Sequence, residues 1–490
     1  MKNFIALEKI SPKTFFFVSS TVVFLSYIKP IFSVWAYSDE YDFFEVTPKL
    51  GSHMARDGNL VASLLYSNFS LPLVSSAGDL WRLRLISFLC LFLILNHVSS
   101  QILTHNPSRS TQFLLPIALT LPAPMTFISW SLIWQGSFAM LIAYTASVLW
   151  LKSSFGIKLI SVILLLCSIL MSPVAAFSIF GFYAVVFILT RVKTVDFVKV
   201  TIKLVSLYGI SGIVSLLTII ICKVVFGLTL NGRVGPPQLS DLPEKMYWVI
   251  SRPITVSMRF FDISSPTNIN AIVTSLLVLS LLVYGFVLQS KNLSESVFSR
   301  LILFSGLIIL SITPIVITWS NQIEFRYILG PSVAFFLVIV VLTLEAIGGR
   351  KNFLKYAPLP SILLISYSGI IGVNSHVSSQ FIAPYKSKID FIQSELSNCP
   401  IKNRALEKVI VLQAKTSYPS RNNIGIFSQS TDMASPWVPI PSVNYVLKTI
   451  GIFPKKIILQ DSLAKSDLNS CIVDLEKYRQ KLAALEGISP

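Results

Sequence analysis

The sequence is poor in charged residues, and this scarcity excludes a soluble protein of its length. Asp, Glu, Lys and Arg make up 13% of the 490 residues, whereas hydrophobic residues make up 53%. Apolar runs of about 20 residues recur along the chain, and each is long enough to cross a hydrocarbon core about 30 Å thick. The composition therefore predicts a polytopic membrane protein.

Cysteine and histidine are also rare, with five and four residues. The sequence contains no CxxC pair, no HExxH, no glycine-rich phosphate loop and no nucleophile elbow, so the usual signatures of zinc, nucleotide and hydrolase sites are missing. Cys90, Cys167 and Cys222 lie in apolar runs, as small buried hydrophobic residues do. Cys399 and Cys471 lie in polar sequence, where either a disulfide or two separate thiols is compatible with a bacterial periplasm.

A single basic stripe is missing as well, although the formal net charge is +17. The Lys and Arg residues are scattered between the apolar runs, which argues against a nucleic-acid partner. Cationic loops are expected of membrane proteins that follow the positive-inside rule, and they would also suit anionic lipid substrates.

About eleven apolar segments are predicted to cross the membrane. They are Thr14–Ala36, Leu83–Leu103, Thr111–Ile128, Leu132–Leu151, Ile157–Met171, Val174–Thr190, Thr201–Leu228, Ile269–Leu288, Leu301–Trp319, Tyr327–Ile347 and Ala357–Val373. Two short helices are expected to meet at Ser172-Pro173, because basic residues on both sides of the pair require an even number of passes. The first run is longer than the core of a cleaved signal peptide, which is the alternative interpretation.

The charges then assign the loops to two sides, with the N-terminus in the cytoplasm. The cytoplasmic loops carry Arg109, Lys152, Lys158, Arg191–Lys203, Lys291, Arg300, Arg350, Lys351 and Lys355. The outer loops are residues 37–81, 229–268 and 320–326, and within the first of them Lys49–Phe69 is predicted to form a helix along the membrane surface. Arg82 and Arg84 are exceptions to the positive-inside rule, because they lie on the predicted outer side.

Composition changes after Val373, and the chain is predicted to divide into a membrane domain (1–377) and an outer module (378–490). The module has two helical patterns and two strand-like runs: Tyr385–Leu396, Ser442–Ile450, Val409–Leu412 and Ile457–Leu459. The predicted fold class is therefore an all-α polytopic membrane protein with a small α/β extracytoplasmic module at its C-terminal end.

Two outer loops place ionisable side chains beside the membrane. The first has Asp39, Glu40 and Asp42, followed by Arg56-Asp57-Gly58, and the last has Glu324-Phe325-Arg326-Tyr327. Such placement needs a reason, because a central Arg or Asp costs about 2.5–3.5 kcal/mol on insertion scales and less near the interface. One alternative is purely structural, with Arg326 paired to a carboxylate such as Glu324 or reaching lipid phosphates.

This layout resembles the GT-C superfamily of glycosyltransferases, which use polyprenyl-phosphate sugars as donors. The likeness is to the bacterial GtrII-like and mannosyltransferase-like branch, although a Gly-Arg order is more usual there than Arg56-Asp57-Gly58. It implies a hexosyltransferase of the bacterial inner membrane that moves a sugar, with inversion, to a glycan, lipid or protein acceptor on the outer face.

The resemblance also implies roles for individual residues. Asp39 is the first choice for the catalytic base and Glu40 the second. Arg326 is expected to bind the donor phosphate, a charge-assisted contact worth about 1.5–3 kcal/mol. Arg252 and Arg259 are expected to assist it. Further substrate-binding candidates are Asp42, Arg56, Asp57 and Tyr327. No cofactor is expected, although the acidic cluster could bind a divalent metal.

Two other functions remain open from the sequence. An O-antigen polymerase or ligase would use arginine and histidine chemistry in a large outer loop, but 229–268 contains no histidine. A lipid-linked glycan flippase or other transporter would place charged residues deep in the bundle and show repeat symmetry. His97 is the main interior candidate for such a role, and a lone intramembrane histidine is more typical of packing.

Overall fold

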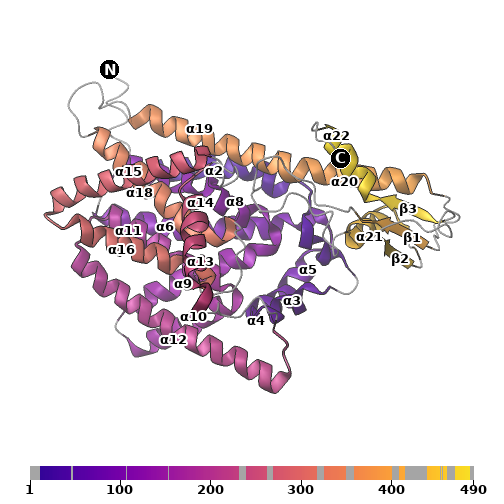
Figure 1. Ribbon diagram of the computed structural model, residues 1–490, viewed down its shortest axis with the longest axis horizontal. Helices are drawn as coiled ribbons and strands as arrows, with labels where there is room; N and C mark the ends of the chain where they lie inside the picture. The colour runs from indigo at the N-terminus through magenta and orange to yellow at the C-terminus, as the bar shows by residue number, and fades with distance from the viewer. Residues whose placement is uncertain are drawn as a thin grey trace.

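The protein is described here by a computed structural model (Figure 1). The described residues are 11–45, 48–105, 108–152, 154–230, 239–261, 269–316, 325–348, 358–399, 408–413, 439–452, 454, 456–460 and 470–485. Side chains at positions 38, 39, 239, 269–272, 325, 358, 359, 380, 439 and 482–485 lie outside the description.

Apolar helices of 8 to 33 residues make up most of the molecule. They are α2 (Pro12–Phe32), α6 (Trp81–His105), α7 (Arg109–Ile117), α8 (Pro122–Ser129), α9 (Trp134–Trp150), α10 (Phe155–Met171), α11 (Pro173–Leu189), α12 (Thr194–Phe226), α15 (Ile269–Leu293), α16 (Val297–Ser311), α18 (Leu329–Gly348) and α19 (Pro358–Val377). Helix α2 begins as its sequence predicts, with Pro12 in the first turn and the Ser11 side chain accepting a hydrogen bond from the Thr14 backbone N–H.

Among the described residues, six helices are long and apolar enough to cross a membrane, and up to eight spans result if each of two bent helix pairs counts as one. The chain is therefore a multi-pass membrane protein. Helices occur within all the predicted crossings, but the predicted count of about eleven is not confirmed. Several of these helices are shorter than the roughly 20 residues that one crossing needs.

Two helix pairs are bent, and one of them shows how the chain folds at Ser172-Pro173. Helices α10 and α11 turn by 120° at Ser172-Pro173, which confirms two short helices in place of one long one. Pro173 lacks the N–H that would continue α10, so a new helix starts there. The second pair, α7 with α8, bends by 57°.

Helix α11 lies at the centre of the bundle, against α9, α16 and α18. It can approach α18 closely because both helices carry glycine at the crossing. A Cβ atom on Gly181 would lie 2.2 Å from the Gly330 carbonyl oxygen, and one on Gly330 would lie 2.4 Å from the Ser178 carbonyl oxygen. Such backbone contact at small residues is typical of helix pairs in membranes.

The segment predicted as one surface helix is broken into shorter pieces. They are α3 (Leu50–Arg56), α4 (Leu60–Leu65), the π-helical η2 (Tyr66–Ser70) and α5 (Leu71–Leu73). The break falls at Gly58, where φ is +80°. A side chain at this position would be strained, so glycine sets the turn between α3 and α4. The single helix over Lys49–Phe69 was therefore a wrong prediction.

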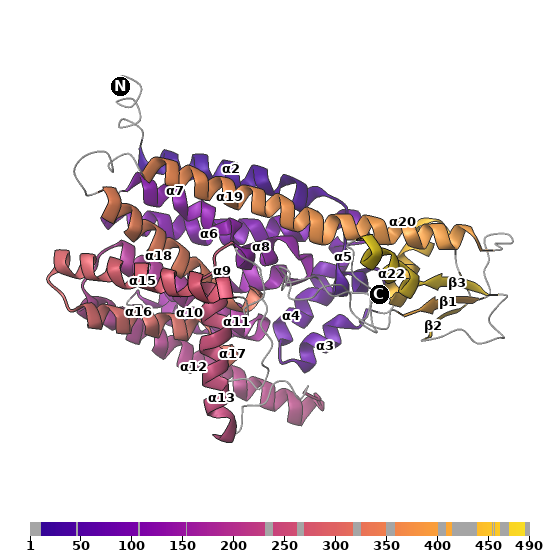
Figure 2. The same ribbon diagram turned by 45° about the horizontal axis from the view of Figure 1, so that its top comes forward.

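A π-helical turn, η11 (Ser378–Ile382), joins α19 to α20 (Ala383–Ser397) so that the two form one long rod (Figures 1 and 2). The rod reaches from the bundle into a C-terminal module, whose remaining elements are β1 (Lys408–Leu412), α21 (Pro439–Thr449), β2 (Lys456–Gln460), β3 (Cys471–Asp474) and α22 (Leu475–Leu485). The three strands are parallel in the order β2-β1-β3, which confirms a small α/β unit. The boundary at residue 378 stays a prediction.

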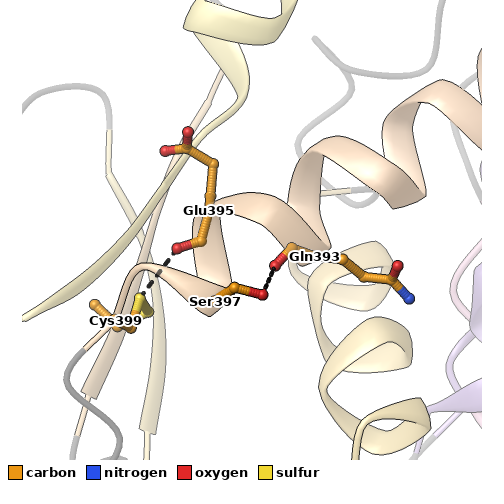
Figure 3. Close-up of a disulfide and its surroundings, with 5 residues drawn as sticks. Gln393, Glu395, Ser397 and Cys399 are labelled. Carbon is orange, nitrogen blue, oxygen red and sulfur yellow. Dashed lines mark hydrogen bonds between the residues drawn. A yellow bond between two sulfur atoms is a disulfide. The ribbon is translucent and has the colours of Figure 1, made fainter.

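The module has its own hydrophobic core, which includes Ile392, Val409, Val411, Val443 and Val473. A disulfide between Cys399 and Cys471 ties the end of α20 to the start of β3. In Figure 3 the Cys399 sulfur also lies beside the carbonyl of Glu395 in the last turn of α20, at 3.4 Å. Of the two alternatives for these cysteines, the structure contains the disulfide.

The remaining described elements are short. They are η1 (Ser38–Phe44), η3 (Ala77–Asp79), η4 (Ala118–Thr120), η5 (Ser131–Ile133), η7 (Leu239–Asp241), α13 (Leu242–Val249), the π-helical η8 (Ile250–Ile254), α14 (Thr255–Ser257), α17 (Thr313–Val316) and η9 (Phe325–Ile328).

Candidate functional site

The first loop forms the short 3-10 helix η1, and Glu40 anchors it to the bundle. The Glu40 side chain is fully buried. One of its oxygens accepts a hydrogen bond from the Tyr37 backbone N–H at 2.8 Å, and the other accepts one from the Ser131 backbone N–H at 2.6 Å. The Arg84 guanidinium lies 3.6 Å away. Both oxygens of this candidate base are thus engaged within the protein.

The environment of Glu40 is unfavourable for a charge. Burial raises the pKa of Glu40 above its usual value, while the charge of Arg84 and the hydrogen bonds from Ser131 and Tyr37 oppose this rise. Burial and the fixed partners of the carboxyl therefore act on its pKa in opposite directions, as they do in buried ion pairs generally.

Arg84 of α6 joins residues 33–35 to the end of α8, at the end of the bundle that carries η1. Its side chain is fully buried and donates to the carbonyls of Ser129 (3.0 Å), Ser33 (3.2 Å) and Trp35 (2.7 Å). The guanidinium also lies over the Trp35 ring, 3.8 Å from its centroid. The sequence did not assign Arg84 to the site. Its position at the start of an apolar helix, on the predicted outer side where the positive-inside rule disfavours arginine, was a usable signal.

Asp42 organises the segment that follows η1. Its carboxylate accepts hydrogen bonds from the backbone N–H groups of Lys49 (3.1 Å) and Leu50 (2.9 Å) and from the Tyr66 hydroxyl (2.8 Å). The first two satisfy N–H groups at the start of α3, as a capping carboxylate does. Asp42 therefore ties η1 to α3 and η2.

The remaining candidates from the loops lie in η1, at the end of α3 or outside the described residues. The backbone of Asp39 is part of η1, between Tyr37 and Glu40, and its side chain lies outside the description. Arg56 and Asp57 are exposed at the end of α3. Glu324, the alternative partner for Arg326, is outside the described residues.

Arg326 lies in η9 and stacks on two aromatic rings. Its guanidinium carbon is 5.1 Å from the centroid of the Trp130 ring and 5.0 Å from that of Tyr327, and one of its N–H groups donates to the Tyr327 hydroxyl at 3.0 Å. Both Arg326 and Tyr327 remain partly exposed. Aromatic stacking holds the cation while leaving edges of the guanidinium for hydrogen bonds.

The turn Ser129–Ser131 brings the two predicted loops together. On one side, Ser131 donates to Glu40 and Ser129 accepts from Arg84. Between them, the Trp130 ring contacts Arg326 and also lies edge-on to Tyr37, with centroids 6.0 Å apart. Residues 40 and 326, far apart in the chain, therefore contact the same three-residue turn.

The long loop reaches the same region. Its π-helical segment η8, which carries Arg252, contacts η9, and α14 contacts α18; in Figure 1, α13 and α14 run across the face of the bundle. Arg259 is 2% exposed. The following residue, Phe260, has φ +50° and packs edge-on against Phe336 of α18, at 5.5 Å between centroids. This packing holds a backbone conformation that is rare for an aromatic residue.

The arrangement therefore places Glu40 of the first loop and Arg326 of η9 on one turn, and the η8 segment that carries Arg252 contacts η9. Among the described residues, no group of three or more His, Cys, Asp or Glu side chains is placed to hold a metal ion. His97 donates or accepts one hydrogen bond with the Tyr144 hydroxyl at 3.0 Å, and the two rings pack edge-on.

Among solved structures, the chain is similar to the archaeal oligosaccharyltransferase AglB from Archaeoglobus fulgidus, solved in complex with an inhibitory peptide and a dolichol-phosphate. The identity is 12% and the TM-score 0.36, with 90% of this chain and 68% of that chain covered. No family model matches the chain, and no curated protein matches it. Similarity at this level identifies neither a family nor an activity.

Proposed function

We propose that this protein is an integral-membrane glycosyltransferase that moves a sugar from a polyprenyl-phosphate carrier to a glycan, lipid or protein acceptor. The observation that carries the proposal is the shared turn Ser129–Ser131. Through it, the acidic first loop and the Arg326–Tyr327 pair, chosen independently from the sequence, meet at one end of the bundle. Transfer between a hydroxyl and an anionic lipid needs a base and a cation at such a place.

In the proposed reaction, Asp39 takes the proton from the acceptor hydroxyl. The acceptor oxygen attacks the anomeric carbon on the face opposite the phosphate, a new C–O bond forms, and the bond to the phosphate oxygen breaks with inversion. The electron pair stays on the lipid phosphate, whose charge Arg326 stabilises, with Arg252 and Arg259 assisting. The reaction needs no cofactor, and the protein supplies the base and the cations.

The choice of Asp39 over Glu40 is supported by the contacts of Glu40. Both of its oxygens accept backbone hydrogen bonds, and the side chain has no exposed surface. We therefore assign to Glu40 the role of anchoring η1, so that its neighbour Asp39 is presented to the acceptor. Asp42, Arg56, Asp57 and Tyr327 stay as proposed substrate contacts.

The decisive experiment compares Asp39→Asn with the wild type, reconstituted with polyprenyl-phosphate sugars and an acceptor extract. The change should lower the transfer rate by about 10²–10⁴-fold, which is the usual contribution of a general base. The elution profile in detergent should stay unchanged. Full activity would refute Asp39 as the base, and transfer only from lipid-diphosphate glycans would favour the polymerase or ligase instead.

We also propose an orientation in the bacterial inner membrane, with the N-terminus in the cytoplasm and the C-terminal module in the periplasm. In support, η1 follows the end of the first apolar helix and contacts α21 of the module. The end of the first apolar helix and the module therefore lie at the same end of the bundle. A reporter fused after Val373 should be active in the periplasm, and cytoplasmic activity would contradict this orientation.

A further inference from the structure

The C-terminal module contacts the end of η1 through helix α21. The Asn444 side-chain amide donates to the Glu45 carboxylate at 3.3 Å, and the Lys448 ammonium donates to the Phe44 carbonyl. Between them, the Tyr445 and Phe44 rings pack with centroids 4.8 Å apart. One face of α21 thus holds the last residues of the candidate catalytic loop.

Helix α20 adds a second contact, closer to the middle of η1. The Lys388 ammonium lies 4.5 Å from the centroid of the Tyr41 ring, and Lys388 itself is 5% exposed. Tyr385 is also buried. Burial raises the pKa of Tyr385 well above its usual value, and the neighbouring Tyr41 and Tyr445 raise it further. Tyr445 also packs edge-on against Tyr41, at 6.3 Å between ring centroids, so these aromatic residues form one cluster between the module and η1.

The π-helical turn before α20 supplies a third contact, at the start of η1. Phe381 stacks on Trp35 at 5.7 Å and lies edge-on to Tyr37 at 5.1 Å between ring centroids. The Trp35 ring also contacts Arg84, whose guanidinium carbon lies 3.8 Å from the ring centroid. The module and its connecting rod therefore contact η1 at both ends and in the middle.

A 3-10 helix of seven residues has poor hydrogen-bond geometry and does not hold its position alone. On the bundle side, η1 is held by Glu40 through Ser131 and Arg84. On the opposite side, it is held by α20 and α21. The location of Asp39 between Tyr37 and Glu40 therefore depends on both contacts.

We infer that the α20–α21 face of the C-terminal module is the positioning surface for the catalytic loop, with Tyr445 and Lys448 as positioning residues. They do not touch the reacting atoms in this scheme; they fix η1, which carries Asp39. This inference rests on the proposed glycosyl transfer for its effect on rate, but not for its effect on η1.

The test uses the full-length protein with Tyr445→Ala and Lys448→Ala. Backbone hydrogen exchange over residues 38–44, measured by mass spectrometry in detergent, should become about tenfold faster, because local opening governs exchange of such a segment. In transfer assays kcat should fall by about 10- to 100-fold with KM for the donor unchanged, since misplacing a reacting group by about 1 Å has effects of this size.

Conservative variants separate positioning from general damage. Tyr445→Phe keeps the ring against Phe44, and Lys448→Arg keeps a cationic N–H donor, so both should restore slow exchange and most of kcat. Lys477→Ala is the matched control, because Lys477 pairs with Glu395 inside the module, at 3.0 Å, and should change neither quantity. Should Tyr445→Ala fail to fold, Lys448→Ala provides the same readout.

Unchanged exchange over η1 in Tyr445→Ala and Lys448→Ala would overturn the inference. A higher KM for the acceptor with unchanged kcat and exchange would also overturn it, because the module would then bind the acceptor instead. Faster exchange in a protein that transfers no sugar would refute the proposed function while leaving the contact between η1 and the module established.

Discussion

Two carboxylate–arginine pairs lie at opposite ends of the bundle and are built in the same way. Near the predicted cytoplasmic loops, Arg300 donates to Glu295 at 2.9 Å and to the Val192 carbonyl at 3.2 Å, and its guanidinium lies 4.7 Å from the centroid of the Phe187 ring. Near η1, Arg84 likewise combines a carboxylate, backbone carbonyls and an aromatic ring. A buried pair of this kind is therefore a way to join helix ends, and by itself it indicates no active site.

The difference between the two pairs lies in their surroundings. Glu295 caps α12 by accepting from the backbone N–H and the hydroxyl of Thr194, and 14% of its side chain is exposed. Glu40 has no exposed side-chain surface. Only the pair near η1 shares its turn with Arg326. The comparison shows that the neighbours of the pair, and not the pair itself, suggest a site.

The largest expected effect is the loss of stability when one partner is removed from the pair near η1. Glu40→Ala leaves the Arg84 charge buried without a counter-charge, which typically destabilises a protein by about 3–5 kcal/mol. Glu295→Ala should cost less, about 1–3 kcal/mol, because solvent reaches part of the Glu295 side chain, although Arg300 is as buried as Arg84. Thermal unfolding of the two variants in the same detergent measures the contrast. Equal losses would mean that the burial of Glu40 has no energetic consequence.

The disulfide should affect the two ends unequally. Replacing Cys399 and Cys471 together by serine removes a covalent link across 72 residues, which typically costs about 2–4 kcal/mol in the domain that contains it. Because α20 carries Tyr385 and Lys388 to η1, exchange over η1 should accelerate, whereas exchange at residues 190–196 should not. Serine at Cys90, a buried free cysteine elsewhere in the bundle, provides the control for a Cys→Ser change. Equal acceleration at both ends would contradict a local effect of the module.

Arg326 is the feature that most clearly distinguishes the end of the bundle near η1. Arg326→Ala should weaken binding of a polyprenyl-phosphate sugar by about 10- to 100-fold, which corresponds to the loss of about 1.5–3 kcal/mol from one charge-assisted contact. The matched control is Arg191→Ala, which removes a half-exposed arginine paired with Glu345 at 2.8 Å. If both variants bind the lipid equally well, Arg326 has no role in donor binding.

Much of the fold could be predicted because its signals are local. Apolar runs indicated the long helices, charge parity indicated the break at Ser172-Pro173, and residue patterns indicated β1, β2, α20 and α21. Strand β3 (Cys471–Asp474) and the largely polar helix α22 were not predicted. The break at Gly58 was missed because an apolar periodicity continues across it.

The site was predictable only in part, because its contacts are not local. Charge and position in the loops made Glu40 and Arg326 candidates, and both contact the turn Ser129–Ser131. The pairing of Glu40 with Arg84, and the role of the apolar turn around Trp130 in joining both loops, depend on how α6 and α8 pack. The same is true of Tyr445, which reaches η1 across about 400 positions in the chain. A single sequence contains no pattern that reports such contacts.

The smallest expected effect is a contrast in pH dependence between the two pairs. Burial raises the pKa of Glu40, so its contribution to stability should be complete below the unfolded pKa and decrease as the pH rises through the folded pKa. For Glu295, burial acts in the same direction, but the hydrogen bonds from Arg300 and Thr194 outweigh it and lower the pKa. Its contribution should therefore be complete above the unfolded pKa and be lost as the pH falls through the folded pKa.

Comparing Glu40→Gln and Glu295→Gln with the wild type in thermal unfolding across the acid range tests this contrast. The stability difference between wild type and Glu40→Gln should shift in favour of the variant as the pH rises from below the usual carboxyl pKa. The difference for Glu295→Gln should shift in favour of the wild type over the same change. Because each titration involves one group, slopes of the same sign would show that the surroundings of the two carboxylates are electrostatically alike, and the distinction between the two ends would then rest on Arg326 alone.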